Sequence, residues 1–167
     1  YVLVAETSYP FTSEDSDFFG NTVSGADSGM PYSVNTEGQA QSVSAVFDAV
    51  SNVGEKGIGV FYWEPAWITV GTNSYEENLA KWEKFGSGWE SSFAGSYCDD
   101  GAKYFGGSSW DNQAMFDRNG NPLQSLNVFG NYADTELGDV DLDGDVTVKD
   151  ATLVQKDIVR LETLTDF

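Results

Sequence analysis

Two glutamates each stand at the end of an apolar run that aromatic residues accompany. Residues 1–6 end in Glu6, and residues 57–67 carry Glu64 among Phe, Tyr, Trp and Pro. A continuous apolar run is typical of a parallel strand covered on both faces. Barrel and open α/β enzymes place their reacting groups at the carboxyl ends of such strands. The pattern therefore indicates carboxylate chemistry at an active-site rim, of the kind that processes sugars.

Two loops place oxygen-bearing residues at the spacing that calcium requires. Residues 15–21 alternate Asp and Asn through a short loop, for which a solvated, metal-free acidic loop is the alternative. Residues 139–150 have the length of an EF-hand loop, with Gly144 at its sixth position. Such loops bind calcium through positions one, three, five, seven, nine and twelve. The tail ligands are then Asp139, Asp141, Asp143, Asp145 through its carbonyl, Thr147 and Asp150.

The segments between these residues predict the elements that position them. Residues 1–6 and 57–63 predict two neighbouring parallel strands, joined by a helix that opens with a capping box at Thr36. A second capping box at Ser74 predicts another helix. One β-α-β unit leaves both sheet edges open, so we expect residues 1–133 to need further strands in order to fold.

The composition limits the partners of this chain of 167 residues. Its net charge of −19 excludes nucleic acid and an anionic membrane surface, and it favours cations or a neutral polysaccharide. With Cys98 as its one cysteine the chain forms no internal disulfide. No apolar run approaches membrane-spanning length. Residues 134–167 are more acidic than the rest, and a polar linker near residues 131–138 predicts a boundary between two domains.

Three motifs, in order along the chain, resemble glycoside hydrolase family 53. They are residues 6–10 (ETSYP), residues 59–67 (GVFYWEPAW) and residues 108–117 (SSWDNQAMFD). The resemblance covers residues 1–132 and implies endo-β-1,4-galactanase activity, in which (arabino)galactan of pectin is cleaved with retention of configuration. It also implies an α/β fold, namely the C-terminal fragment of a (β/α)8 TIM barrel that contains strands seven and eight.

The resemblance assigns roles to several residues. It makes Glu6 the nucleophile, whereas the general acid/base glutamate of the family follows strand four and lies outside this chain. Glu64 then orients its neighbours and does not react. Trp63 is implied as the platform beneath the sugar at the cleavage point, because an indole ring matches the apolar face of galactose. Trp67 and Trp110 are candidates for further sugar subsites, with core packing as the alternative for both.

The same resemblance implies a calcium ion between the loops that follow strands seven and eight. This chain has Phe19 where the family leads us to expect His, a change that is harmless if only the backbone carbonyl binds the metal. The implied ligands are Asp15, Asp17, the Phe19 carbonyl, Asn21, Ser108 and Asp111.

The acidic tail, residues 133–167, resembles the first repeat of a type I dockerin. Its loop closes with Asp150, as dockerin loops do, whereas most EF-hands close with Glu. The resemblance implies a small helical half-dockerin that binds a cohesin module of a scaffoldin. An exposed helix face is the alternative for the implied cohesin-binding residues, which are Val148, Lys149, Gln155, Lys156 and Arg160.

Together these patterns predict a catalytic-barrel part in residues 1–132 and a truncated dockerin in residues 133–167. The leading hypothesis is a secreted, extracellular, cellulosome-associated galactanase that uses calcium, of which this part alone is inactive because it lacks the acid/base glutamate. A non-catalytic, calcium-dependent docking module with an inactive barrel remnant is the alternative. A lectin-like sugar binder, suggested only by the aromatic content, is a third hypothesis.

Overall fold

The computed structural model describes most of the chain, which forms two compact units, Tyr1–Val128 and Phe129–Phe167. The described residues are 1–24, 29–87, 90–132, 140, 145 and 147–158. The predicted division after residue 132 stays a prediction. Within the described residues, no helix has the length and apolar character needed to cross a membrane.

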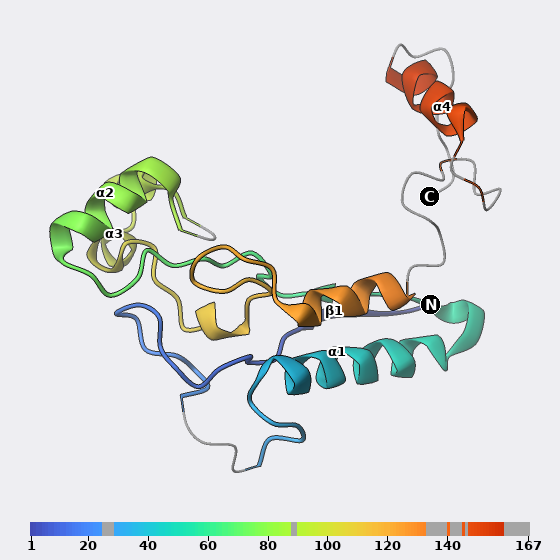
Figure 1. The fold of residues 1–167 in the computed structure, drawn as a ribbon, viewed down its shortest axis with the longest axis horizontal. Coiled ribbons are helices and arrows are strands. Elements are labelled where there is room, and N and C mark those ends of the chain that lie inside the picture. The colour runs from blue at the N-terminus through green and yellow to red at the C-terminus, as the bar shows by residue number, and fades with distance from the viewer. Residues whose placement is uncertain (25–28, 88–89, 133–139, 141–144, 146, 159–167) are drawn as a thin grey trace. The chain divides into compact units, whose positions relative to one another are not determined.

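The first unit combines one β-α-β element, residues 2–62, with a group of short helices at residues 75–104, here called the helical lobe (Figure 1). The described elements of both units, with 3-10 helices marked η, are β1 (Val2–Thr7), α1 (Thr36–Ser51), η1 (Gly54–Lys56), β2 (Gly57–Tyr62), α2 (Tyr75–Phe85), η2 (Ser92–Ser96), α3 (Asp99–Tyr104), η3 (Asp111–Gln113), η4 (Gln124–Tyr132) and α4 (Val148–Ile158).

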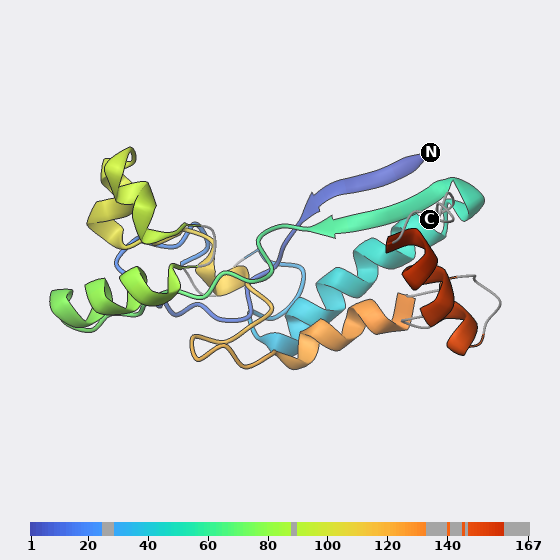
Figure 2. The same cartoon turned by 90° about the horizontal axis from the view of Figure 1, so that it is seen from above.

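Strands β1 and β2 form a parallel pair, which confirms the prediction of two neighbouring strands that run in one direction (Figure 2). The register places Leu3 opposite Gly59, and Thr7 opposite Tyr62. The backbone N–H of Trp63 donates to the carbonyl of Thr7 at 2.8 Å, so the pairing continues past the end of β2. The carboxyl ends of both strands therefore meet at the same edge.

The prediction that both strands are buried is wrong for the described structure. Helix α1 contacts both strands, yet the side chains of Val2, Leu3, Ile58 and Phe61 are exposed. A two-stranded sheet with one covering helix cannot remove both of its faces from water. The apolar residues that predicted a doubly covered strand are thus present, but the described chain does not cover them.

The two helix starts differ in how well the sequence predicted them. Helix α2 begins with the expected capping box, in which Ser74 and Glu77 each satisfy a backbone N–H of the other. In α1 the cap is Asn35, whose side chain accepts from the N–H of Gly38, and Thr36 is the first helical residue. Asn is as good an N-cap as Thr, so the capping box at Thr36 is wrong by one position.

Gln39, the fourth residue of the capping box predicted at Thr36, is fully buried instead and ties α1 to four other segments. Its Nε2 donates to the carbonyls of Tyr9 at 2.9 Å and Ala114 at 3.0 Å. The hydroxyl of Ser125 donates to Gln39 Oε1, and Tyr62 Oη also lies within hydrogen-bond distance of Nε2. This amide holds the chain after β1, the end of β2, the segment after η3 and the start of η4 in one arrangement.

The helical lobe has a small core of its own. Val70, Trp82 and Phe105 are buried together, and the rings of Trp82 and Phe105 meet edge to face with centroids 6.0 Å apart. The sequence pattern did not predict α3, which has only six residues. After Pro122 the chain forms the 3-10 helix η4, which begins at Gln124.

Candidate active site and cation-binding loops

A pocket of about 460 Å³ opens where β1 and β2 end. Its lining residues are Glu6, Thr7, Ser8, Trp63 and Trp110. The strand pairing brings Glu6 and Trp63 together, because the Trp63 N–H binds the carbonyl of the residue next to Glu6. The Glu6 side chain is exposed, as a carboxylate that must reach a substrate has to be. Glu6 thus lies at the predicted rim, beside the predicted sugar platform.

The three tryptophans predicted to bind sugar divide into two groups. Trp63 is 41% exposed and Trp110 is 37% exposed, and both line the pocket with Glu6. Trp67 is only 7% exposed and lies apart from that pocket, beside Phe11 and Phe116. A ring must present a free face to stack on a sugar, so the structure contradicts the subsite role of Trp67 and supports its alternative role in packing.

Glu64 follows β2 but does not line this pocket. Its backbone is in the left-handed region, with φ +49°, which turns the chain immediately after Trp63. The next residue, Pro65, accepts a hydrogen bond from the N–H of Met115 at 2.7 Å, so the turn is fixed from outside. Glu6 is therefore the one carboxylate among the described residues that line the pocket.

Two residues that the sequence analysis missed hold the rim in place. The hydroxyl of Ser8, beside Glu6 in the pocket, donates to Gln113 Oε1 at 2.6 Å. The hydroxyl of the half-buried Tyr62 donates to the backbone carbonyl of Gln113 at 2.7 Å. Burial raises the pKa of Tyr62 to about 12, so it remains a neutral donor at physiological pH. Both residues lie inside motifs that carry the resemblance, but no spacing rule identifies them.

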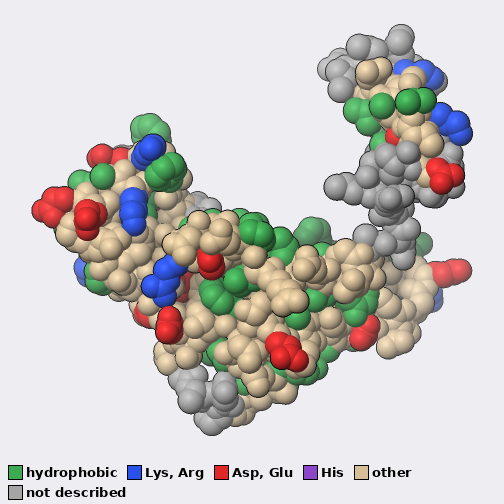
Figure 3. All heavy atoms as spheres, in the orientation of Figure 1, with side chains coloured by type: hydrophobic (Ala, Val, Ile, Leu, Met, Phe, Trp, Pro, Cys, Tyr) green, Lys and Arg blue, Asp and Glu red, His purple; other side chains and the backbone are tan. Residues whose placement is uncertain are grey.

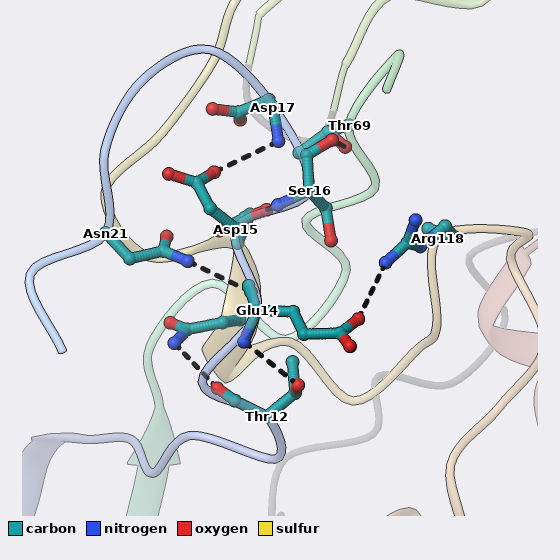
Figure 4. Close-up of polar contacts among 10 residues, drawn as sticks. Thr12, Glu14, Asp15, Ser16, Asp17, Asn21, Thr69 and Arg118 are labelled. Carbon is teal, nitrogen blue, oxygen red and sulfur yellow. Dashed lines mark hydrogen bonds and ion pairs between the residues drawn. The ribbon is translucent and has the colours of Figure 1, made fainter. Parts of the chain in front are cut away.

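The two loops of the first predicted calcium site lie against each other in the described structure, and Figure 4 shows the side chains of the first loop. The backbone N–H of Ser16 donates to Asp111 Oδ2 at 3.2 Å, and the N–H of Ser108 donates to Asp17 Oδ2 at 3.0 Å. Asp15 Oδ1 accepts from the N–H of Asp17 at 3.1 Å. Carboxylates from each loop therefore bind the backbone of the other.

Two of these carboxyl groups, those of Asp17 and Asp111, are buried close to other negatively charged side chains. Burial raises the pKa of Asp17 to about 6, against the opposing effect of the backbone N–H groups that it accepts. Burial also raises the pKa of Asp111 to about 7, and the negative charges of Asp17 and Asp15 raise it further. A bound cation would relieve both effects, since it offsets desolvation and like-charge repulsion together.

Two buried oxygen atoms at this site also lack a hydrogen-bond partner among the described residues. Asn21 Oδ1 and Asp111 Oδ1 accept no hydrogen bond from any described residue, although Asn21 Nδ2 donates to the carbonyl of Glu14 at 3.3 Å. Phe19 packs its ring on Tyr104, which leaves only its backbone available to an ion. No three His, Cys, Asp or Glu side chains converge as a metal-holding group among the described residues. The fit to calcium therefore depends on amide, hydroxyl and carbonyl oxygens beside carboxylates.

The second predicted calcium loop is described only in part. Asp139, Asp141 and Asp143 lie outside the described residues, whereas Asp145 is described and exposed. Asp150 is 2% exposed and accepts from the N–H groups of Val140 and Thr147, each at 2.7 Å. The carboxylate that is predicted to close the loop is thus buried and binds two backbone N–H groups.

The predicted cohesin-binding residues lie on α4. Val148, Lys149 and Gln155 are exposed and Lys156 is half-buried, while Arg160 lies outside the described residues. Val148 is an apolar side chain in water at the first turn of α4, whose backbone the Thr147 hydroxyl caps by accepting from the N–H of Lys149 at 3.1 Å. The exposure of Val148 and Gln155 is consistent both with a docking role and with a simple exposed helix face.

A parallel β-α-β unit with a carboxylate and two tryptophans where its strands end places the protein in the α/β class, and comparison with known proteins gives the family. The model of glycosyl hydrolase family 53 matches residues 1–129. A Bacillus subtilis protein named Endo-beta-1,4-galactanase is 52% identical over 136 residues, which are 80% of this chain and 32% of the relative. A Humicola insolens protein named Arabinogalactan endo-beta-1,4-galactanase is 34% identical over 100 residues, which are 60% of this chain and 19% of that protein.

The protein belongs to glycosyl hydrolase family 53. Among solved structures, the Ignisphaera aggregans GH53 catalytic domain is similar to it with a TM-score of 0.54 and 32% identity. That match covers 78% of this chain and 29% of the domain's chain. The chain spans about a third of the length of the Bacillus relative, so it contains part of what that protein contains.

Proposed function

We propose that this chain supplies strands seven and eight of a (β/α)8 barrel that cleaves internal β-1,4 bonds of galactan with retention. The observation that carries the proposal is the pocket that Glu6 and Trp63 share at the ends of two parallel strands. The galactanase names of the relatives support the substrate. The exposed apolar side chains of β1 and β2 support the barrel, because neighbouring strands and helices would cover them.

In the proposed mechanism Glu6 acts as the nucleophile. Its carboxylate attacks the anomeric carbon while a carboxylic acid from another strand protonates the departing sugar oxygen. Water then attacks the glycosyl-enzyme ester, and the second carboxylate accepts the proton of that water, so that Glu6 is released unchanged. Trp63 would support the sugar ring, and Ser8 would keep the rim in register through Gln113.

A chimera tests this proposal. In it, residues 1–129 of this chain replace the matching segment of the Bacillus subtilis relative, which provides the remaining strands. We expect the chimera to hydrolyse β-1,4-galactan and to release products whose new reducing ends first have the β configuration, as proton NMR would show. A folded chimera that leaves galactan intact, or that releases the α anomer first, would refute the proposal.

Calcium is the proposed cofactor at the site between the two loops. The ligands would be Asp15, Asp17, the Phe19 carbonyl, Asn21, Ser108 and Asp111. The buried oxygens of Asn21 and Asp111 that no described residue satisfies support this assignment. The ion would hold the two loops together, and the second of them carries Trp110, which lines the pocket of Glu6.

The second proposed function belongs to the tail. We infer a secreted, extracellular protein whose residues 133–167 bind calcium and then a scaffoldin cohesin, so that the enzyme joins a cellulosome. The burial of Asp150 within its turn supports this hypothesis. The alternative is that docking is the sole activity of the protein and the barrel part is inactive.

A matched pair of variants tests the tail on the complete chain. Asp150→Ala removes the closing ligand and should abolish calcium-dependent capture by an immobilised type I cohesin. Asp145→Ala should leave capture intact, because position seven binds calcium through its backbone carbonyl. Equal loss in both variants, or capture that survives a chelator, would refute the docking assignment. Capture by a chain whose chimera cleaves no galactan would favour the purely docking alternative.

A further inference from the structure

A second, larger cavity lies in the first unit, away from Glu6. Its volume is about 810 Å³, which is within the usual range for small-molecule sites. Residues 66 and 68–73, the C-terminal part of α2 and residues 118–120 line it. It shares no lining residue with the pocket of Glu6, and neither the proposed reaction nor the proposed calcium ions use it.

The charge of this cavity is opposite to that of the protein. Among the described residues, Lys81 and Arg118 line it and no carboxylate does, although the chain has 27 acidic and 8 basic residues. The ammonium group of Lys84 lies 4.7 Å from the ring centroid of Phe85, a lining residue, and adds a third cation nearby. Figure 3 shows most of the Lys and Arg side chains of this unit over the helical lobe and the segment beside it.

One wall of the cavity is held by α2. The buried side chain of Asn78 donates from Nδ2 to the carbonyl of Gly71 at 2.8 Å. Lys81 Nζ donates to the carbonyl of Val70 at 3.2 Å, which fixes the position of the ammonium group. An ammonium group has three N–H donors, so two remain for a ligand in addition to the one that binds Val70. The wall and its cation are therefore held in place before any ligand arrives.

Another part of the cavity wall, residues 118–120, belongs to a turn that the side chain of Asp117 closes. Its carboxylate accepts from the N–H groups of Asn119 at 2.8 Å and Asn121 at 2.9 Å, and from Asn121 Nδ2 at 2.9 Å. These hydrogen bonds with Asn121 lower the pKa of Asp117, so its charge is engaged within the turn. Arg118 Nη2 lies 3.2 Å from Glu14 Oε2 (Figure 4). A guanidinium has five donors, which leaves it capacity for a second anion.

We propose that this cavity binds a uronic acid residue, a sugar that carries a carboxylate, within a polysaccharide. Lys81 and Arg118 match the carboxylate, and the amides of Asn73 and Asn119 match hydroxyl groups. Phe85, which is 75% exposed, offers an aromatic face to the apolar side of the ring. The choice of a carboxylate-bearing sugar over another ligand with a carboxylate rests on the proposed polysaccharide-cleaving function. A neutral galactan chain has no charge for two cations to bind. The site would therefore recognise an acidic segment of the polysaccharide that adjoins the neutral galactan.

The test is a titration of the complete, ¹⁵N-labelled chain with the linear trimer of galacturonic acid, followed by NMR. We expect the amide signals of Gly71, Gly86 and Gly120, which line the cavity, to shift with the acidic trimer and not with the neutral β-1,4-galactose trimer. Raising the salt concentration from 0.1 to 1 M should weaken binding, since it shortens the screening length from about 10 Å to about 3 Å.

Charge-removing variants locate the ligand. Lys81→Gln and Arg118→Gln should each weaken binding of the acidic trimer on the order of fivefold. Lys56→Gln makes the same change of charge at η1, away from the lining residues, and should leave binding unchanged. Equal shifts with the neutral trimer or with inorganic phosphate, or an equal loss in Lys56→Gln, would overturn the uronate site.

The test separates this site from the proposed function. If the complete chain gives no dispersed spectrum, the chimera carries the same variants, with binding measured by calorimetry. Galactan cleavage by the chimera without any binding of the acidic trimer overturns the uronate site and leaves the galactanase proposal standing. Binding that depends on Lys81 and Arg118, in a folded chimera that cleaves no galactan, supports the site and refutes the galactanase.

Discussion

Acidification should release calcium from the site between the two loops, at a pH higher than for an ordinary carboxylate site. Calcium competes with protons for the carboxylates that bind it. The pKa of Asp111 is raised to about 7 and that of Asp17 to about 6, whereas their ordinary value is 3.8. Both groups should therefore protonate between pH 8 and pH 5 when the metal is absent, and the affinity for calcium should fall over that range.

These two values set the size of the effect. At pH 6 a group of pKa 7 has about ten protonated forms for each ionised one, and a group of pKa 6 has one. Protons should then weaken the apparent affinity for calcium by about twentyfold between pH 8 and pH 6. Most of that factor comes from Asp111.

The same shifts predict how stability changes with pH. Because both folded-state pKa values lie above 3.8, the metal-free folded protein binds protons more tightly than the unfolded chain does. Its free energy of unfolding should therefore fall as the pH rises from about 4 through 7. Calcium removes this penalty, and at a hundred times its dissociation constant it adds about 2.7 kcal/mol. The calcium-dependent shift in melting temperature should grow with pH.

Calorimetric titration of the chimera with calcium at pH 6, 7 and 8 measures this directly, because the chimera lacks the tail loop. Asp111→Asn should bind calcium more weakly and lose most of the pH dependence, whereas Asp99→Asn, an exposed residue of α3, should behave as the parent does. An affinity that is the same at pH 6 and pH 8, or unchanged calcium binding in Asp111→Asn, would refute the reasoning.

Two further predictions concern the rim and its support. Gln39→Ala should lower the free energy of unfolding by about 2–4 kcal/mol, because it leaves several buried groups without partners, whereas exposed Gln41→Ala should change it by less than about 0.5 kcal/mol. Denaturant unfolding of the chimera measures both, and equal effects would contradict the role of Gln39. Trp63→Ala should reduce kcat/KM for galactan at least about tenfold with little change in stability. Trp67→Ala should instead cost about 3–5 kcal/mol of stability, and the reverse pattern would show that the roles are exchanged.

The sequence predicted the elements whose signals are local. The apolar runs at residues 1–6 and 57–63 predicted the parallel strands, and the capping box at Ser74 predicted α2. Such features depend on the order of polar and apolar residues within a short stretch of sequence. That order also placed Glu6 and Trp63 at one rim, since parallel strands that pair end at the same edge.

Features that depend on contacts between residues far apart in the sequence could not be predicted in this way. Gln39 has the position of a capping residue, but its four partner segments become neighbours only in the fold, which buries it. Trp67 belongs to the same motif as Trp63, and only the turn at Glu64 separates the buried ring from the exposed one. The cationic cavity also escaped the sequence, because Lys81 and Arg118 lie 37 positions apart.

The measurement that tests the central claim most directly is galactan hydrolysis by the chimera with Glu6 replaced. Glu6→Gln should lower kcat at least about a thousandfold, and Glu6→Ala with added azide should yield the α-galactosyl azide, because azide then attacks from the side that the nucleophile has vacated. Glu64→Gln is the matched control and should retain most of the activity. Near-normal cleavage by Glu6→Gln in a folded chimera, or a loss as large in Glu64→Gln, would contradict the account.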